Sequence, residues 1–127
     1  MKTILVDAYN TFIIDGEGIN EAMHKMLEEY PNKKIILTSA NDEQMITFGL
    51  NNMPYEVFTL KHDPEKTDLK YYKTMLEHFG LQAEEVLYFE HGEEAVKTAQ
   101  DVGITTHYYD KDKKDLVAVK EFLDQNI

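Results

Sequence analysis

The 127-residue chain carries 24 acidic and 13 basic side chains, a formal net charge of −11, and every base is a lysine. Nucleic-acid binding is therefore not expected, because basic side chains supply much of the affinity for a phosphate backbone. The absence of cysteine excludes disulfides, thiol catalysis and cysteine-bound zinc.

The composition, 43% hydrophobic and 29% charged, is typical of a soluble globular protein. We expect residues 1–127 to form a single domain. The first apolar run, Ile4–Val6, is too short for a signal peptide, and no segment approaches the roughly 20 apolar residues of a membrane helix. We therefore expect a cytoplasmic protein with no membrane association.

Five short stretches rich in β-branched and aromatic residues predict strands. They are Thr3–Val6, Lys34–Leu37, Tyr55–Leu60, Glu85–Phe89 and Ile104–Tyr109. Because longer segments with helical spacing separate them, the chain should form parallel βαβ units with right-handed crossovers. The sequence thus predicts an α/β fold in three layers, with helices on both faces of one five-stranded parallel sheet.

Helix boundaries are also marked in the sequence. Three polar residues are suited to cap helix N-termini, namely Asn20, Asn41 and Asp68. Gly80 and Gly103 follow helical stretches, where a residue with positive φ commonly closes the helix. The charge run Lys111–Asp115 is expected to lie in a solvated loop before the last helix.

The first strand ends in Asp7, and a hydroxyl follows four residues later at Thr11. Ligands of open α/β sheets bind beyond the carboxyl ends of the strands, so Asp7 is well placed to act there. A carboxylate can attack phosphorus or carbon, and it can bind Mg²⁺. The alternative is a structural role, in which Asp7 caps the turn through backbone N–H groups.

The second strand ends in Thr38, with Ser39 next and a helix start capped by Asn41 soon after. Hydroxyl groups beside a helix N-terminus suit an anion such as phosphate. The alternative is that Thr38 or Ser39 only helps to start the helix.

A lysine, Lys66, stands just before the third helix. The helix dipole already makes that end positive, so a cation there is more favourable if it faces an anion. The anion could belong to the site, or it could be a neighbouring acid among Asp63, Glu65 and Asp68.

The fourth strand ends in Glu90, followed by His91, and Glu94 lies four residues after Glu90. Glu90 and Glu94 could form an acidic metal-binding site. They could equally be glutamates that stabilise the first turn of a helix, where negative charge is favourable. His91 could be a ligand or an acid/base group, or simply a solvated loop residue.

Taken in this order, the motifs resemble the four motifs of the haloacid dehalogenase (HAD) superfamily, over the stretch from Ile4 to about Tyr109. The resemblance implies a Rossmann-like sheet of strand order 5-4-1-2-3, whose motifs meet at the carboxyl ends. It also implies that Asp7 is the nucleophile, that Thr38 and Ser39 bind phosphate, and that Lys66 serves both catalysis and phosphate binding.

The resemblance further implies a Mg²⁺ cofactor held by Asp7, the backbone carbonyl of Tyr9, and Glu90 or Glu94. The expected activity is that of a Mg²⁺-dependent phosphohydrolase or phosphotransferase acting on a small-molecule phosphate. The metal and Lys66 would neutralise the charge of the transferring phosphoryl group.

Two positions depart from the family pattern. Tyr9 stands where phosphatases of the superfamily carry a second aspartate, the acid/base group, so Tyr9 is a candidate catalytic residue of altered type. Glu90-His91 replaces the usual glycine–aspartate or pair of aspartates. The start Asp7-Ala8-Tyr9 is similar to the 2-haloacid dehalogenases, but those enzymes cradle the halide with an arginine, and this chain has none.

The spacing between motifs leaves no room for the cap domain that usually closes such a site, so we expect a capless member. The segment 12–18 is the candidate flap. Capless members tend to use a partner subunit or a large substrate as the lid, which makes a homo-oligomer possible. The alternative function is a catalytically degenerate HAD fold that binds a partner protein.

Overall fold

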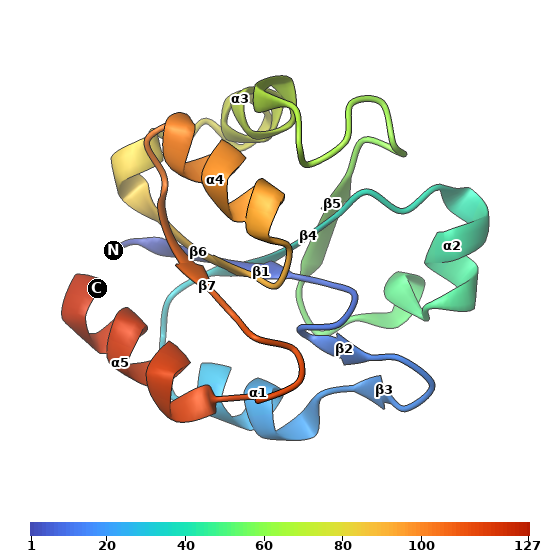
Figure 1. Cartoon of the computed structure of the whole chain (residues 1–127), viewed down its shortest axis with the longest axis horizontal. Helices are drawn as coiled ribbons and strands as arrows, with labels where there is room; N and C mark the ends of the chain where they lie inside the picture. The colour runs from blue at the N-terminus through green and yellow to red at the C-terminus, as the bar shows by residue number, and fades with distance from the viewer.

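One parallel sheet of five strands organises the computed structural model, which describes all 127 residues (Figure 1). Its strands are β1 (Thr3–Asp7), β4 (Lys34–Thr38), β5 (Glu56–Thr59), β6 (Val86–Glu90) and β7 (Thr105–Tyr108). They lie side by side in the order β5-β4-β1-β6-β7. Counting only these strands along the chain, the order from the β7 edge is 5-4-1-2-3, as expected.

Helices cover both faces of this sheet and complete three layers. They are α1 (Glu21–Leu27), α2 (Asp42–Thr47), α3 (Leu69–Phe79), α4 (Glu93–Asp101) and α5 (Leu116–Asn126), with short 3₁₀ turns at Leu50–Asn52 and Ala83–Glu85. In Figure 1, α3 and α4 lie above the sheet and α1 and α5 below it, while α2 lies beyond the carboxyl ends of β1 and β4. The predicted three-layer α/β fold is confirmed.

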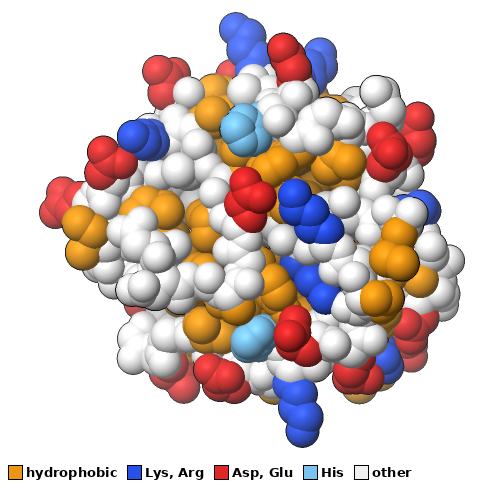
Figure 2. All heavy atoms as spheres, turned by 180° about the vertical axis from the view of Figure 1, so that it is seen from behind, with side chains coloured by type: hydrophobic (Ala, Val, Ile, Leu, Met, Phe, Trp, Pro, Cys, Tyr) orange, Lys and Arg blue, Asp and Glu red, His pale blue; other side chains and the backbone are white.

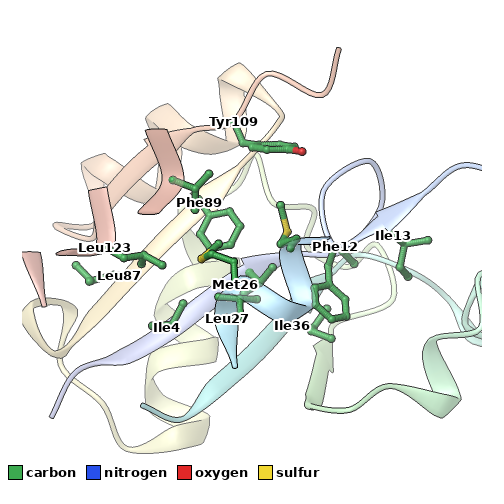
Figure 3. Close-up of a cluster of buried hydrophobic side chains, with 14 of the residues drawn as sticks. Ile4, Phe12, Ile13, Met26, Leu27, Ile36, Leu87, Phe89, Tyr109 and Leu123 are labelled. Carbon is green, nitrogen blue, oxygen red and sulfur yellow. The ribbon is translucent and has the colours of Figure 1, made fainter. Parts of the chain in front are cut away.

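Successive side chains of the central strand β1 point to opposite faces of the sheet and therefore pack into two separate cores. Ile4 and Val6 of β1 belong to the cluster under α1 and α5, part of which Figure 3 shows, whereas Leu5 belongs to the cluster under α3 and α4. All five residues of β1 are buried. Burial on both faces explains why this strand reads as a continuous apolar run.

The predicted helix caps are confirmed. The side chain of Asn20 accepts a hydrogen bond from the backbone N–H of Met23 at 3.2 Å, and Asn41 forms a capping box with Gln44. Asp68 accepts from the N–H of Lys70 at 2.9 Å. Gly80 closes α3 with φ of 65°, and Gly103 follows the end of α4 with φ of 101°.

Three strands extend one residue further than the apolar pattern indicates, and each added residue is polar. Asp7 pairs with Leu37 across β1 and β4, Thr38 with Thr59, and Glu90 with Tyr108. Parallel pairing therefore carries a polar side chain to the carboxyl edge of three adjacent strands.

The candidate flap contains a feature that the sequence pattern did not indicate. Two-residue strands β2 (Ile13–Ile14) and β3 (Gly18–Ile19) pair as an antiparallel hairpin between β1 and α1. Gly16 and Gly18 have positive φ, 77° and 87°, which glycine adopts without strain. Strands this short have too few residues for a periodic pattern.

The surface seen in Figure 2 carries acidic and lysine side chains that are interspersed, with hydrophobic atoms showing between them. The predicted solvated loop at Lys111–Asp115 is exposed and precedes α5. None of the helices combines the length and the apolar character that crossing a lipid bilayer requires.

Candidate functional site

A cavity of about 290 Å³ opens at the carboxyl ends of β1, β4 and β6. We use the name floor for the lining side chains that are buried or nearly buried, which are Asp7, Thr38, Lys66 and Glu90. We use the name rim for the more exposed lining side chains, which are Tyr9, Gln44, Phe48 and His62. Ser39 and His91 also line the cavity and are half-buried. The predicted strand-end residues Asp7, Thr38 and Glu90 therefore meet at one place.

Asp7 is buried at the end of β1 and accepts hydrogen bonds on both oxygens. Lys66 Nζ lies 2.6 Å from Oδ1. Oδ2 accepts from the Thr11 hydroxyl at 2.7 Å, from the backbone N–H of His91 at 3.3 Å, and from the His91 ring. Burial alone would raise the pKa of Asp7, but the Lys66 charge and the His91 hydrogen bond outweigh burial and hold it well below its ordinary value.

Glu90 is buried at the end of β6 and is equally well partnered. Its Oε1 is 3.0 Å from Lys66 Nζ and accepts from the Tyr88 hydroxyl. Its Oε2 accepts from the backbone N–H of Gly92 at 2.8 Å and lies 3.2 Å from His91 Nδ1. A Cβ at position 92 would lie 3.3 Å from Oε2, so glycine permits this close approach.

Lys66 joins the two carboxylates from a third segment of the chain. Its side chain is 12% exposed and pairs with Asp7 and Glu90 rather than with the neighbouring acids. Asp68 caps α3 instead, and Glu65 lies 2.7 Å from the His62 ring. Burial would lower the pKa of Lys66, but the charges of Asp7 and Glu90 raise it above its ordinary value, so this side chain stays cationic.

His91 is a second positive group beside the carboxylates. Its hydrogen bonds to Asp7 and Glu90 raise the pKa of the imidazole to about 9, although partial burial acts in the opposite direction. The floor and His91 together hold two acids and two bases. One ligand atom from each of Asp7, Glu90 and His91 lies within 4.8 Å of the others, so these three side chains could hold a metal ion.

Thr38 combines the two roles that the sequence left open. Its hydroxyl accepts from the backbone N–H of Ala40 at 3.2 Å, which helps to start the turn before α2, and the residue also lines the cavity. Its carbonyl accepts from the buried Tyr71 hydroxyl of α3 at 2.7 Å, which fixes the strand end. Ser39 lies beside it on the cavity wall.

Glu94 stands apart from this group. It is exposed in the first turn of α4, is not part of the cavity lining, and does not join the cluster of possible metal ligands. Glu90 is therefore the acid of the fourth strand that the structure brings to Asp7.

The rim contains residues that the sequence did not indicate. The rings of Tyr9 and Phe48 stack with centroids 4.7 Å apart. The His62 ring reaches Gln44 on one side and Glu65 on the other. Gln44 and Phe48 belong to α2 and its C-terminus, and His62 belongs to the loop after β5, so only the tertiary fold places them together.

No protein-family model matches the chain. No curated protein matches its sequence either.

Several solved structures share the architecture. One is a HAD family enzyme from Bacteroides thetaiotaomicron, an aspartate-to-alanine mutant in complex with magnesium and inorganic phosphate. It superimposes with a TM-score of 0.70 at 15% sequence identity, and the match covers 85% of this chain and 93% of that chain. The core domain of a candidate phosphoglycolate phosphatase from Streptococcus pneumoniae gives 0.63 at 14% identity, covering 97% and 95%.

An uncharacterised protein from Corynebacterium glutamicum also gives a TM-score of 0.63, at 13% identity, covering 98% of this chain and 96% of that one. Identities this low establish the fold and not the activity. The sheet order, the crossovers and these structural neighbours agree, so the chain has the fold of the HAD superfamily.

Proposed function

We propose that this protein is a phosphohydrolase or phosphotransferase that uses Asp7 as the nucleophile toward a small-molecule phosphate. The observation that carries the proposal is the buried contact of Asp7 with Lys66, at the open end of the central strand and on the floor of a cavity. The magnesium and phosphate complex of a neighbour with the same fold supports this class of chemistry.

In the proposed reaction, an Asp7 oxygen attacks the phosphorus atom, an acyl phosphate bond forms, and the bond to the leaving-group oxygen breaks. Water then releases inorganic phosphate and restores the carboxylate, or an acceptor hydroxyl takes the phosphoryl group. The low pKa of Asp7 keeps it ionised for attack. Lys66, Thr38 and Ser39 would bind the phosphoryl oxygens, because an ammonium and two hydroxyls can neutralise and orient them.

The donor set fits a divalent cation. Asp7 and Glu90 provide two buried carboxylates whose charges Lys66 and His91 compensate, and a divalent cation could take the place of the His91 proton between them. We expect Asp7, Glu90 and the carbonyl of Tyr9 to hold it, with Mg²⁺ as the metal that the resemblance implies. A bound cation would supply charge neutralisation for the phosphoryl group.

Tyr9 bears on which substrates would react. Desolvation and the nearby Asp15 raise the pKa of the Tyr9 hydroxyl above its ordinary value, so it is a weak proton donor. Losing a positioned acid/base group typically slows such reactions by about 10²–10⁴. Phosphates with good leaving groups, such as aryl phosphate esters or acyl phosphates, need this acid least and are the substrates we expect.

The test is hydrolysis of p-nitrophenyl phosphate by the wild type and by Asp7→Asn, with and without divalent metal. We expect metal-dependent turnover that Asp7→Asn abolishes, because an amide cannot form the acyl phosphate. Equal rates from the two proteins would contradict the proposal.

The other function that the residues support is binding of a partner protein without catalysis. It is favoured by the replacement of the acid/base aspartate by Tyr9 and by the complete pairing of the floor carboxylates. In that case Asp7→Asn should leave complex formation intact while no phosphate ester is turned over, and oligomer measurements should show whether the partner is a second copy.

A further inference from the structure

The two floor carboxylates divide their oxygens between two partners. Lys66 takes Oδ1 of Asp7 and Oε1 of Glu90. The remaining oxygens, Oδ2 and Oε2, both face His91: its Nδ1 is within hydrogen-bond distance of the first and 3.2 Å from the second. Two carboxylate oxygens and one imidazole nitrogen therefore converge at one point.

One possible ligand atom from each of Asp7, Glu90 and His91 lies within 4.8 Å of the others, and Nδ1 of His91 is 3.2 Å from Oε2, so the three side chains are close enough to share a single metal ion. A metal with ligands about 2.0–2.2 Å away places adjacent ligand atoms roughly 3 Å from one another. The carboxylates are also fixed from outside, by the Thr11 hydroxyl at 2.7 Å from Asp7 and the Gly92 N–H at 2.8 Å from Glu90. Such outer partners orient the ligands of metal sites.

A nitrogen in this set changes which cation the site should prefer. Mg²⁺ favours oxygen ligands, whereas neutral imidazole suits first-row transition metals, whose binding would displace the Nδ1 proton of His91 to solvent. We infer that His91 is a protein ligand beside Asp7 and Glu90, and that the site selects a transition cation of the Mn²⁺-to-Zn²⁺ series over Mg²⁺. The inference rests on the proposed metal site and replaces the Mg²⁺ that the resemblance implies with a transition cation, but it does not require that the protein turn over a phosphate.

The experiment uses metal alone as the probe. Co²⁺ and Mg²⁺ are titrated separately into the wild type and His91→Ala by calorimetry, with the visible spectrum of Co²⁺ as a record of imidazole ligation. We expect the wild type to bind Co²⁺ more tightly than Mg²⁺. His91→Ala should weaken Co²⁺ binding by about tenfold or more and change Mg²⁺ binding much less.

Two further variants complete the design. His78→Gln replaces an exposed histidine of α3 that lies outside the cavity lining, and it should bind both metals as the wild type does. His91→Asp makes the set all-oxygen, so it should bind Mg²⁺ more tightly and lose the imidazole signature in the Co²⁺ spectrum. If His91→Ala does not fold, the metal affinities of His91→Asp test the inference in its place.

An equal loss of both metals in His91→Ala would overturn the inference, as would unchanged Co²⁺ affinity, or Mg²⁺ binding to the wild type as tight as Co²⁺ binding. The outcome is separable from that of the proposed function. If Co²⁺ binds through His91 but no phosphate ester is hydrolysed, only the proposed phosphohydrolase activity is contradicted. If Mg²⁺ supports turnover and His91→Ala does not change the rate, only the assignment of the metal is contradicted.

Discussion

The floor and the rim of the cavity differ in how firmly the protein holds them. On the floor, every oxygen of Asp7 and Glu90 accepts at least one hydrogen bond from the protein, and the connecting Lys66 is nearly buried. On the rim, Tyr9 and Phe48 are half-buried and stack on each other, and His62 is exposed. The floor is therefore ordered before any ligand arrives, whereas the rim can adjust.

The difference follows from the cost of removing charge from water. A buried carboxylate is stable only with close, well-aligned partners, and the rigid strand ends hold Asp7 and Glu90 in place for theirs. Aromatic and amide side chains have no such requirement, so they can lie on the short helix α2 and its end. Under the proposed function, the charge-based chemistry would belong to the floor and the choice of leaving group to the rim.

Lys66→Met is the change that should damage the floor most. It leaves two buried carboxylates with His91 as the remaining side-chain cation. Breaking a buried ion pair typically costs about 3–5 kcal/mol, and we expect the free energy of unfolding in metal-free urea titrations to fall by this order. Lys70→Met, at an exposed lysine of α3, is the control and should stay within about 0.5 kcal/mol of wild type. A comparably small loss for Lys66→Met would mean that this cation does not hold the floor.

The pH dependence of the free energy of unfolding is a second test of the floor, with a smaller expected effect. The folded protein holds the pKa of Asp7 below its unfolded value, so this group contributes stability that is present above the unfolded pKa, about 4, and lost as the pH falls below it. Between pH 6 and pH 3, the wild type should lose more free energy of unfolding than Asp7→Asn, measured by urea titration at each pH. Parallel pH curves for the two proteins would contradict the Asp7 assignment.

Phe48→Ala tests the rim and should have the smallest effect. Stacking on an aromatic ring is worth about 0.5–1.5 kcal/mol, so KM for an aryl phosphate should rise by roughly 2–13-fold while kcat changes little. Ile46→Ala, an exposed position on the same helix, should leave both constants unchanged. A fall in kcat with constant KM would show that the rim shapes the chemistry rather than substrate binding.

The sequence could predict most of the floor because parallel strands end at a common edge. An apolar run that stops at Asp7, Thr38 or Glu90 locates each of these residues at that edge without any knowledge of side-chain contacts. Lys66 could be anticipated as well, since its place before a helix is unfavourable unless an anion compensates it.

The remaining features depend on tertiary contacts that no local pattern records. Glu94 and His91 both follow Glu90 closely, and only the turn into α4 shows that the histidine faces the cavity while the glutamate faces solvent. The roles of Gly92 and Tyr88 depend on where the Glu90 oxygens point. The Tyr9–Phe48 stack likewise joins segments 39 residues apart in the chain, whose proximity the order of motifs does not encode.

The Lys66 contacts also affect how long a folded molecule survives. They join residues 59 and 24 positions apart, so they can form only after the segments that carry β1, β6 and the start of α3 have assembled. Contacts that form after the folding barrier slow unfolding without speeding folding. We therefore expect Lys66→Met to speed unfolding, which would tie the lifetime of the native state to the same charges that the proposed chemistry uses.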